Sequence, residues 1–244
     1  MIEAVAERLD IKESLYNKVA PHLGEHTIFA TNTSGLSVET LSEKFPADLK
    51  HRFCGVHFFN PPRYMHLVEL IPTAATAPEY LDNLERFLVS TLGKGVVRAK
   101  DTPNFIGNRI GVFSMLATIY NTEKFGLRFD VVDDLTGRRL GRAKSATYRT
   151  ADVVGLDTFA HVAKTMEDNL PEDPWHAFFS IPAWLQALIA DARQAVISDS
   201  LIDQVLVPVT PIPQVVSNDR NQAEFVETLA MYLEKRVTAW RINT

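Results

Sequence analysis

Two residues, His57 and Glu69, have the side chains of a general acid–base pair. Each lies in an apolar, β-rich stretch, residues 52–59 and 66–71, which predicts two neighbouring strands. A lone carboxylate buried in such a stretch is costly, and an adjacent imidazolium would offset that cost. A carboxylate that fixes the ring tautomer would make His57 a general base, a role worth roughly 10² to 10⁴ in rate. The pattern alone fits a purely structural pair at least as well.

Two further polar positions follow or precede predicted elements. The loop at residues 31–35 follows a strand and precedes a helix, and open α/β sheets bind ligands at such loops. Ser34 in this loop could donate to a substrate oxygen, and Asn108 near the start of an apolar helix could reach a cleft between domains. Because no G-x-S-x-G elbow occurs, we do not expect a nucleophilic serine hydrolase. Turn and capping roles, or an exposed helix position, are the alternatives.

A metal centre is not expected. His57, His66 and Glu69 lack the spacing of zinc ligands, and Cys54 is the single cysteine of the chain. One cysteine also excludes an intramolecular disulfide framework. A reducing, cytoplasmic setting is the default expectation.

Composition excludes several classes of partner. The 244 residues hold 30 acidic and 25 basic side chains, a net charge of -5, and no block of Lys or Arg. We therefore expect no general affinity for nucleic acid or for an anionic membrane. No apolar run approaches the ~18 residues that a membrane span needs. The first residues are acidic and lack a basic n-region, so no signal peptide is expected.

The elements that must position these residues alternate along the first hundred residues. Strands are expected near residues 2–6, 27–30, 52–59, 66–71 and 95–99, and helices near 9–23, 37–44 and 81–92. This alternation predicts the α/β class with a largely parallel sheet. After Asp101 the pattern becomes helical, from 105 to about 188. We predict domains at 1–102 and 103–191, joined by a hinge near 100–103, and a tail at 192–244 that matches no pattern we know.

Several motifs occur together in one order. They are Glu3-Ala4-Val5-Ala6-Glu7, Asn32-Thr33-Ser34, Gly55-Val56-His57-Phe58-Phe59-Asn60-Pro61, Leu67-Val68-Glu69, Lys100-Asp101-Thr102-Pro103 and Asn108-Arg109. With them, the chain from about residue 2 to about 190 resembles the L-3-hydroxyacyl-CoA dehydrogenases. The stretch at 141–157 is similar to the long bacterial β-oxidation proteins that fuse this enzyme to an enoyl-CoA hydratase.

The resemblance implies a Rossmann-type sheet followed by an all-helical dimerisation domain. It also implies an oxidoreductase of fatty acid β-oxidation that oxidises the 3-hydroxyl of a fatty acyl-CoA with NAD. Carried over by position, His57 is the base and Glu69 its partner, while Ser34 and Asn108 hold the substrate oxygens. A homodimer is the expected assembly.

The resemblance also assigns residues to NAD. Glu7 and Lys12 match positions at the ribose, and Asn32 and Asn60 match the loops beside the nicotinamide. The G-x-G-x-x-G loop that cradles the pyrophosphate does not occur in the sequence. We therefore expect the first part of the Rossmann domain to be missing. Its absence would leave the strand near 2–6 as an exposed apolar edge. The alternatives are a truncated, non-catalytic remnant, or one part of a split enzyme whose partner chain supplies the missing N-terminal half.

Overall fold

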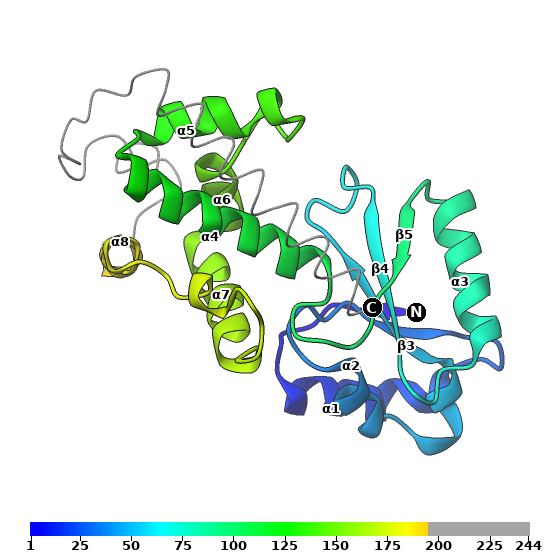
Figure 1. Ribbon diagram of the computed structural model, residues 1–244. Coiled ribbons are helices and arrows are strands. Elements are labelled where there is room, and N and C mark those ends of the chain that lie inside the picture. The colour runs from blue at the N-terminus through cyan, green and yellow to red at the C-terminus, as the bar shows by residue number, and fades with distance from the viewer. Residues whose placement is uncertain (195–244) are drawn as a thin grey trace. The chain divides into compact units, whose positions relative to one another are not determined.

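The computed structural model describes residues 1–194, and its contacts divide the chain into two compact units between Arg109 and Ile110 (Figure 1). The division falls a few residues after the boundary expected at 102.

The first unit contains a five-stranded sheet in the order β1-β2-β3-β4-β5. The strands are β1 (Ile2–Glu3), β2 (Phe29–Thr31), β3 (Phe53–Phe58), β4 (Leu67–Pro72) and β5 (Gly95–Arg98). All neighbours are parallel except β3 and β4, which are antiparallel. The predicted α/β class with a largely parallel sheet is therefore confirmed.

The first strand is shorter than predicted. It pairs with β2 only through Ile2 and Glu3, not through residues 2–6. The backbone N–H of Val5 donates to the Glu3 carboxylate at 3.1 Å, so the chain turns away from the sheet there. A side chain has thus replaced the next ladder hydrogen bond.

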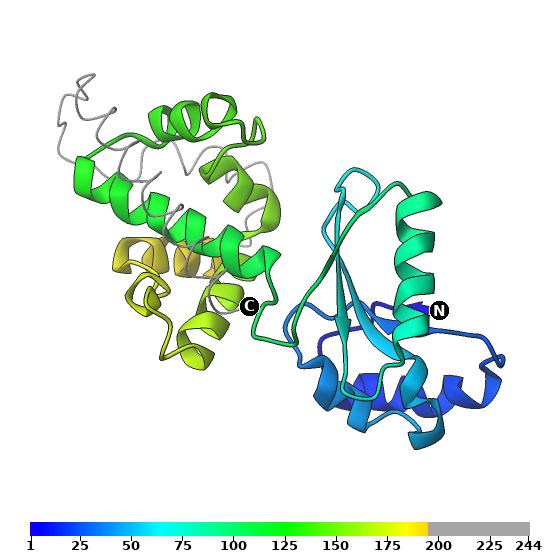
Figure 2. The same cartoon turned by 45° about the vertical axis from the view of Figure 1, so that its right-hand side comes forward.

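Helices cover both faces of this sheet, with α3 on one face and α1 and α2 on the other (Figure 2). Their bounds are α1 (Leu9–Val19), α2 (Val38–Glu43) and α3 (Pro78–Ser90), with short 3-10 turns η1 (Ala20–His22) and η2 (Ala47–Arg52). Ser37 is the N-cap of α2, and its hydroxyl accepts the backbone N–H of Thr40.

Alternation along β3 and β4 decides which face each side chain occupies. Cys54, Val56, Val68 and Leu70 pack in the cluster that includes α3. The residues of opposite parity, His57 and Glu69 among them, therefore lie on the α1–α2 face.

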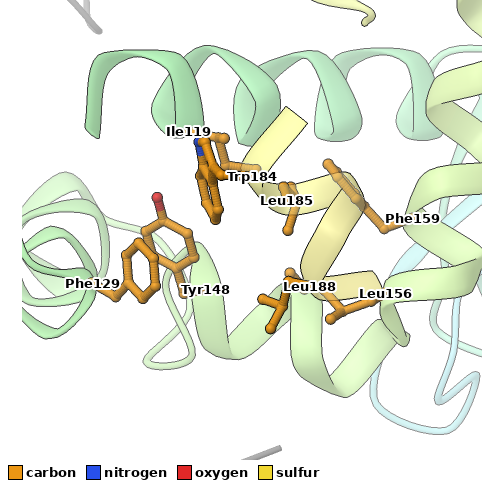
Figure 3. A pocket seen from close by; sticks show the side chains of 9 residues that line it. Ile119, Phe129, Tyr148, Leu156, Phe159, Trp184, Leu185 and Leu188 are labelled. Carbon is orange, nitrogen blue, oxygen red and sulfur yellow. The ribbon is translucent and has the colours of Figure 1, made fainter. Parts of the chain in front are cut away.

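The second unit is helical throughout its described part, as predicted. Its elements are α4 (Gly107–Phe125), which begins before the division, α5 (Phe129–Thr136), η3 (Arg138–Leu140), α6 (Tyr148–Val154), α7 (Leu156–Asn169), η4 (His176–Phe178) and α8 (Ala183–Gln194). Their apolar faces meet around a small pocket, where Phe129, Tyr148 and Trp184 lie on one side and Phe159 on the other (Figure 3). Because every side chain toward the pocket is apolar or aromatic, it belongs to the hydrophobic core of the unit.

The predicted tail at 192–244 lies almost wholly outside the described residues. Within residues 1–194, no helix is long and apolar enough to cross a membrane.

Candidate active site

The structure brings His57 and Glu69 together. They are paired residues of the antiparallel strands β3 and β4, and Nδ1 of the ring lies 2.7 Å from Oε2 of the carboxylate. His57 is 4% exposed and Glu69 is fully buried. The hydrogen bond is therefore shielded from water, where it is stronger than at a surface.

The second oxygen of Glu69 reaches the start of α4. Oε1 accepts the backbone N–H groups of Ile106 at 2.9 Å and of Gly107 at 2.8 Å. The carboxylate is thus fixed by two backbone donors, and Oε2 is left to face the ring. An ionised carboxylate only accepts hydrogen bonds, so a neutral ring that faces one would carry its proton on Nδ1 and leave Nε2 bare.

Aromatic side chains cover the imidazole. The ring of Phe59 lies 4.6 Å and the ring of Phe105 lies 5.5 Å from that of His57, centre to centre. A Cβ atom added at Gly107 would overlap the ring of Phe59. Glycine at this position therefore leaves room for the half-buried Phe59 ring to pack against the histidine.

Ser34 lies in a loop that is held by Glu7. The backbone N–H of Ser34 donates to Oε1 of Glu7 at 2.9 Å, and the Thr33 hydroxyl donates to Oε2 at 2.8 Å. The hydroxyl of Ser34 itself makes no hydrogen bond to residues 1–194. It is therefore available to a ligand, while the carboxylate of Glu7 positions the loop.

Lys12, which was expected at the NAD ribose, is instead buried in an ion pair. Its ammonium lies 2.9 Å and 3.0 Å from the two carboxylate oxygens of Glu3, and 3.9 Å from Glu7. Glu3 also accepts hydrogen bonds from the hydroxyls of Tyr16 and Thr31. Burial, and next the charge of Glu3, raises the pKa of Tyr16. The ammonium of Lys12 is thus buried, and it lies within ion-pair distance of the Glu7 carboxylate.

Sequence reasoning missed Glu3. The available signal was an acid in the first apolar strand, nine residues before a lysine that the α1 periodicity turns inward. A buried acid of this kind needs a cation, just as Glu69 needs a histidine.

The three asparagines are placed differently. Asn32 follows β2, and its Oδ1 accepts the backbone N–H of Phe58 at 3.0 Å, which ties the ends of β2 and β3 together. Asn60 is exposed after β3, and Asn108 is half-buried in the first turn of α4. Within the described residues, neither Asn60 nor Asn108 has a side-chain hydrogen bond.

These residues fit one half of a dinucleotide. The Asn32 amide nitrogen and the Asn60 side chain make no hydrogen bond within the described part of the chain. They suit a ribose and a carboxamide. No glycine-rich loop for a pyrophosphate occurs in the 244 residues. Residues 1–194 also contain no group of three His, Cys, Asp or Glu side chains that could hold a metal ion.

Comparison with known proteins finds a family model and several proteins that parts of this chain resemble. Residues 1–102 match the family model described as "3-hydroxyacyl-CoA dehydrogenase, NAD binding domain". A probable 3-hydroxyacyl-CoA dehydrogenase of Bacillus subtilis is 46% identical over 189 residues, 78% of this chain and 24% of that protein. A putative fatty acid oxidation complex trifunctional enzyme of Rickettsia prowazekii is 36% identical, over 74% of this chain and 25% of its own length.

A solved structure of a similarly described protein also resembles this chain. The 3-hydroxybutyryl-CoA dehydrogenase of Escherichia coli superposes with a TM-score of 0.67 at 28% identity, covering 79% of this chain and 39% of that one. This chain therefore spans about a quarter of the two curated relatives and well under half of the solved one.

A second family model matches the other end of the chain. Residues 180–244 match the model described as "Transglycosylase SLT domain". This range includes the segment 192–244, and it overlaps α8, whose Leu185 and Ile189 are buried in the core of the helical unit.

Proposed function

We propose that this chain, whose first 102 residues belong to the family of 3-hydroxyacyl-CoA dehydrogenase NAD-binding domains, supplies the catalytic base of an enzyme that oxidises L-3-hydroxyacyl-CoA to 3-oxoacyl-CoA. The observation that carries the proposal is the hydrogen bond between His57 and Glu69, in a chain of this family. Fatty acid β-oxidation is the setting we propose for it.

In this proposal, His57 removes a proton through Nε2. Glu69 holds the proton of Nδ1, so the bare nitrogen points away from the carboxylate and can accept the proton of the substrate 3-hydroxyl. The imidazolium that forms is stabilised by the buried negative charge of Glu69. NAD, when bound, supplies the acceptor for the hydride that leaves C3.

The other residues bind and orient. We assign the Ser34 hydroxyl and Asn108 to the oxygens of the substrate. Asn32 and Asn60 would contact the nicotinamide end of the cofactor. Glu7 would contact its ribose, with Lys12 fixing Glu7 from below.

The missing phosphate loop favours a second candidate. Because no G-x-G-x-x-G motif occurs in the sequence, this chain by itself would hold NAD weakly. It would then be a non-catalytic remnant, or one part of an enzyme completed by a partner that carries this loop. We also propose that the chain forms a homodimer and is located in the cytoplasm.

Formation of NADH from a short-chain L-3-hydroxyacyl-CoA, followed by absorbance, tests the first proposal. We expect turnover by the native chain and a loss on the order of 10² to 10⁴ in His57→Gln. His66→Gln is the matched control, because His66 is exposed nine residues along the chain. Turnover that survives His57→Gln would exclude His57 as the base. Calorimetry with NAD distinguishes the second candidate from the first. The second candidate predicts no measurable binding of NAD by the native chain.

A further inference from the structure

The helical unit contains a half-buried arginine without a carboxylate partner. Nη2 of Arg142 donates to the hydroxyl of Ser114, on α4, at 2.6 Å, and within the described residues the guanidinium makes no ion pair. Burial lowers the pKa of Arg142. A guanidinium has five N–H donors, and Arg142 makes one side-chain hydrogen bond within the described residues, so the other donors are open to a ligand. An anionic ligand would supply the missing acceptors.

The acidic side chains of the adjoining helix α5 do not supply them. Each of its three carboxylates is already engaged: Asp130 binds Arg128, Asp133 accepts the backbone N–H groups of Thr147, Tyr148 and Arg149, and Asp134 binds Arg139. Positive charge on the segment after α5 is therefore left uncompensated. Exposed Arg138 and Lys144 add to it, since neither makes an ion pair in the part of the chain that the structure describes.

The backbone beside Arg142 offers further donors. Gly141 has a φ of 69°, a left-handed conformation that turns the chain out of η3. Three residues directly follow Arg142 in the chain: Ala143, Lys144 and Ser145. Their backbone N–H groups have no acceptor among residues 1–194. Three successive N–H groups without a protein acceptor in this range thus directly follow Arg142 in the chain, and backbone N–H groups of this kind can bind an anion.

We propose that residues 141–145, with the side chains of Arg142 and Lys144, bind a phosphate group. The planar fork of a guanidinium matches two phosphate oxygens, and backbone N–H groups can take the remaining ones. The phosphate could belong to a coenzyme A thioester or could be free inorganic phosphate. The site goes beyond the proposed function, because it is formed by contacts within the helical unit alone.

Calorimetric titration of the full chain tests this site, with coenzyme A, dephospho-coenzyme A and inorganic phosphate as probes. We expect at least one probe to bind, with an affinity that falls as salt rises. Arg142→Gln should weaken binding about tenfold or more, and Lys144→Gln by a smaller factor. Arg139→Gln is the matched control. It removes the same charge from the same segment, but Asp134 already holds its guanidinium, so affinity should stay within about twofold.

The outcomes separate the ligand sources and the alternatives. Preference for coenzyme A over its dephospho form assigns the site to the 3′-phosphate of that molecule, and equal binding of inorganic phosphate assigns it to the free ion. No binding of any probe at millimolar concentration would overturn the proposal. An equal loss in Arg139→Gln and Arg142→Gln would overturn it too, because diffuse surface charge would then be responsible. If Arg142→Gln does not fold, exposed Lys144→Gln still decides.

Discussion

The two ring nitrogens of His57 have different neighbours, and this difference determines what the residue can do. Nδ1 faces a carboxylate whose other oxygen is occupied by the N–H groups of Ile106 and Gly107. A glutamine at position 69 has one oxygen only. If that oxygen accepts the two backbone N–H groups, its amide NH₂ faces Nδ1, which must then become an acceptor. The ring proton would move to Nε2 and block the base.

A glycine beside the histidine gives the first prediction. In Gly107→Ala the added Cβ would overlap the Phe59 ring, so Phe59 should move and expose His57. We expect faster modification of His57 by diethyl pyrocarbonate, read by peptide mapping, and a loss of about 1 to 3 kcal/mol in the free energy of unfolding.

Gly111→Ala on the same helix is the control, since a Cβ there meets nothing within 4 Å. It should stabilise the chain by roughly 0.5 to 1 kcal/mol. Unchanged modification of His57 in Gly107→Ala would show that Phe59 does not shield the ring.

At the scale of residues, the sequence predicts a pair only where both members interrupt apolar strands. His57 and Glu69 do so in two long strands and were identified. Glu3 lies in a strand of two residues, too short to show a pattern, and its role depends on Lys12, Tyr16 and Thr31, which come from other elements. Which side chains meet Glu3 depends on the tertiary fold, so a local sequence pattern cannot show it.

Among the elements, α2 depends on a carboxylate from a distant segment. Asp101 accepts the Ser37 hydroxyl at 2.7 Å and the N–H groups of Val38 and Glu39 at 3.0 and 2.8 Å. Asp101→Ala should therefore lower the free energy of unfolding by about 1 to 3 kcal/mol in urea titrations. Exposed Asp48→Ala should change it by less than about 0.5 kcal/mol. Equal effects of both would exclude this capping role.

The buried group around Glu3 predicts a stability that depends on pH. Burial and the charge of Glu3 raise the pKa of Tyr16, which joins α1 to β1. Below about pH 10 the phenol is neutral in both states, and its contribution is complete. At higher pH the unfolded chain releases the proton and the folded chain keeps it. The free energy of unfolding should then fall by up to about 1.4 kcal/mol per pH unit.

Urea titrations at pH 9 and pH 11 measure this effect. Tyr16→Phe should lose less stability between the two pH values than the native chain does. An equal loss in both would show that other groups account for the alkaline destabilisation.

The order and type of the elements could be predicted, and their ends only in part. Short apolar, β-rich runs identified every strand of the sheet, because strands covered by helices on both faces are apolar on both sides. The end of β1 could not be predicted, since a side-chain hydrogen bond to Val5 decides it. Nor could sequence show that Glu69 would accept the first N–H groups of α4, which lie 37 and 38 residues further along the chain.

In the whole molecule, the proposed base and the proposed phosphate site lie in different units. The sheet unit holds the base, its carboxylate and the loop with Ser34. The helical unit contains the hydrophobic core with its small pocket, and the cationic segment at 141–145. Neither unit contains a glycine-rich phosphate loop, so the enzyme proposal depends on how this chain binds NAD. The base, by contrast, can be examined without any cofactor.

The tautomer of His57 shows whether the Glu69 carboxylate prepares the ring to act as a base. Nitrogen-15 NMR of the histidine-labelled chain, at a pH where the ring is neutral, reports which nitrogen carries the proton. We expect protonated Nδ1 and bare Nε2 in the native chain, and the reverse in Glu69→Gln. A native ring protonated on Nε2, or a tautomer that Glu69→Gln leaves unchanged, would contradict this role of Glu69.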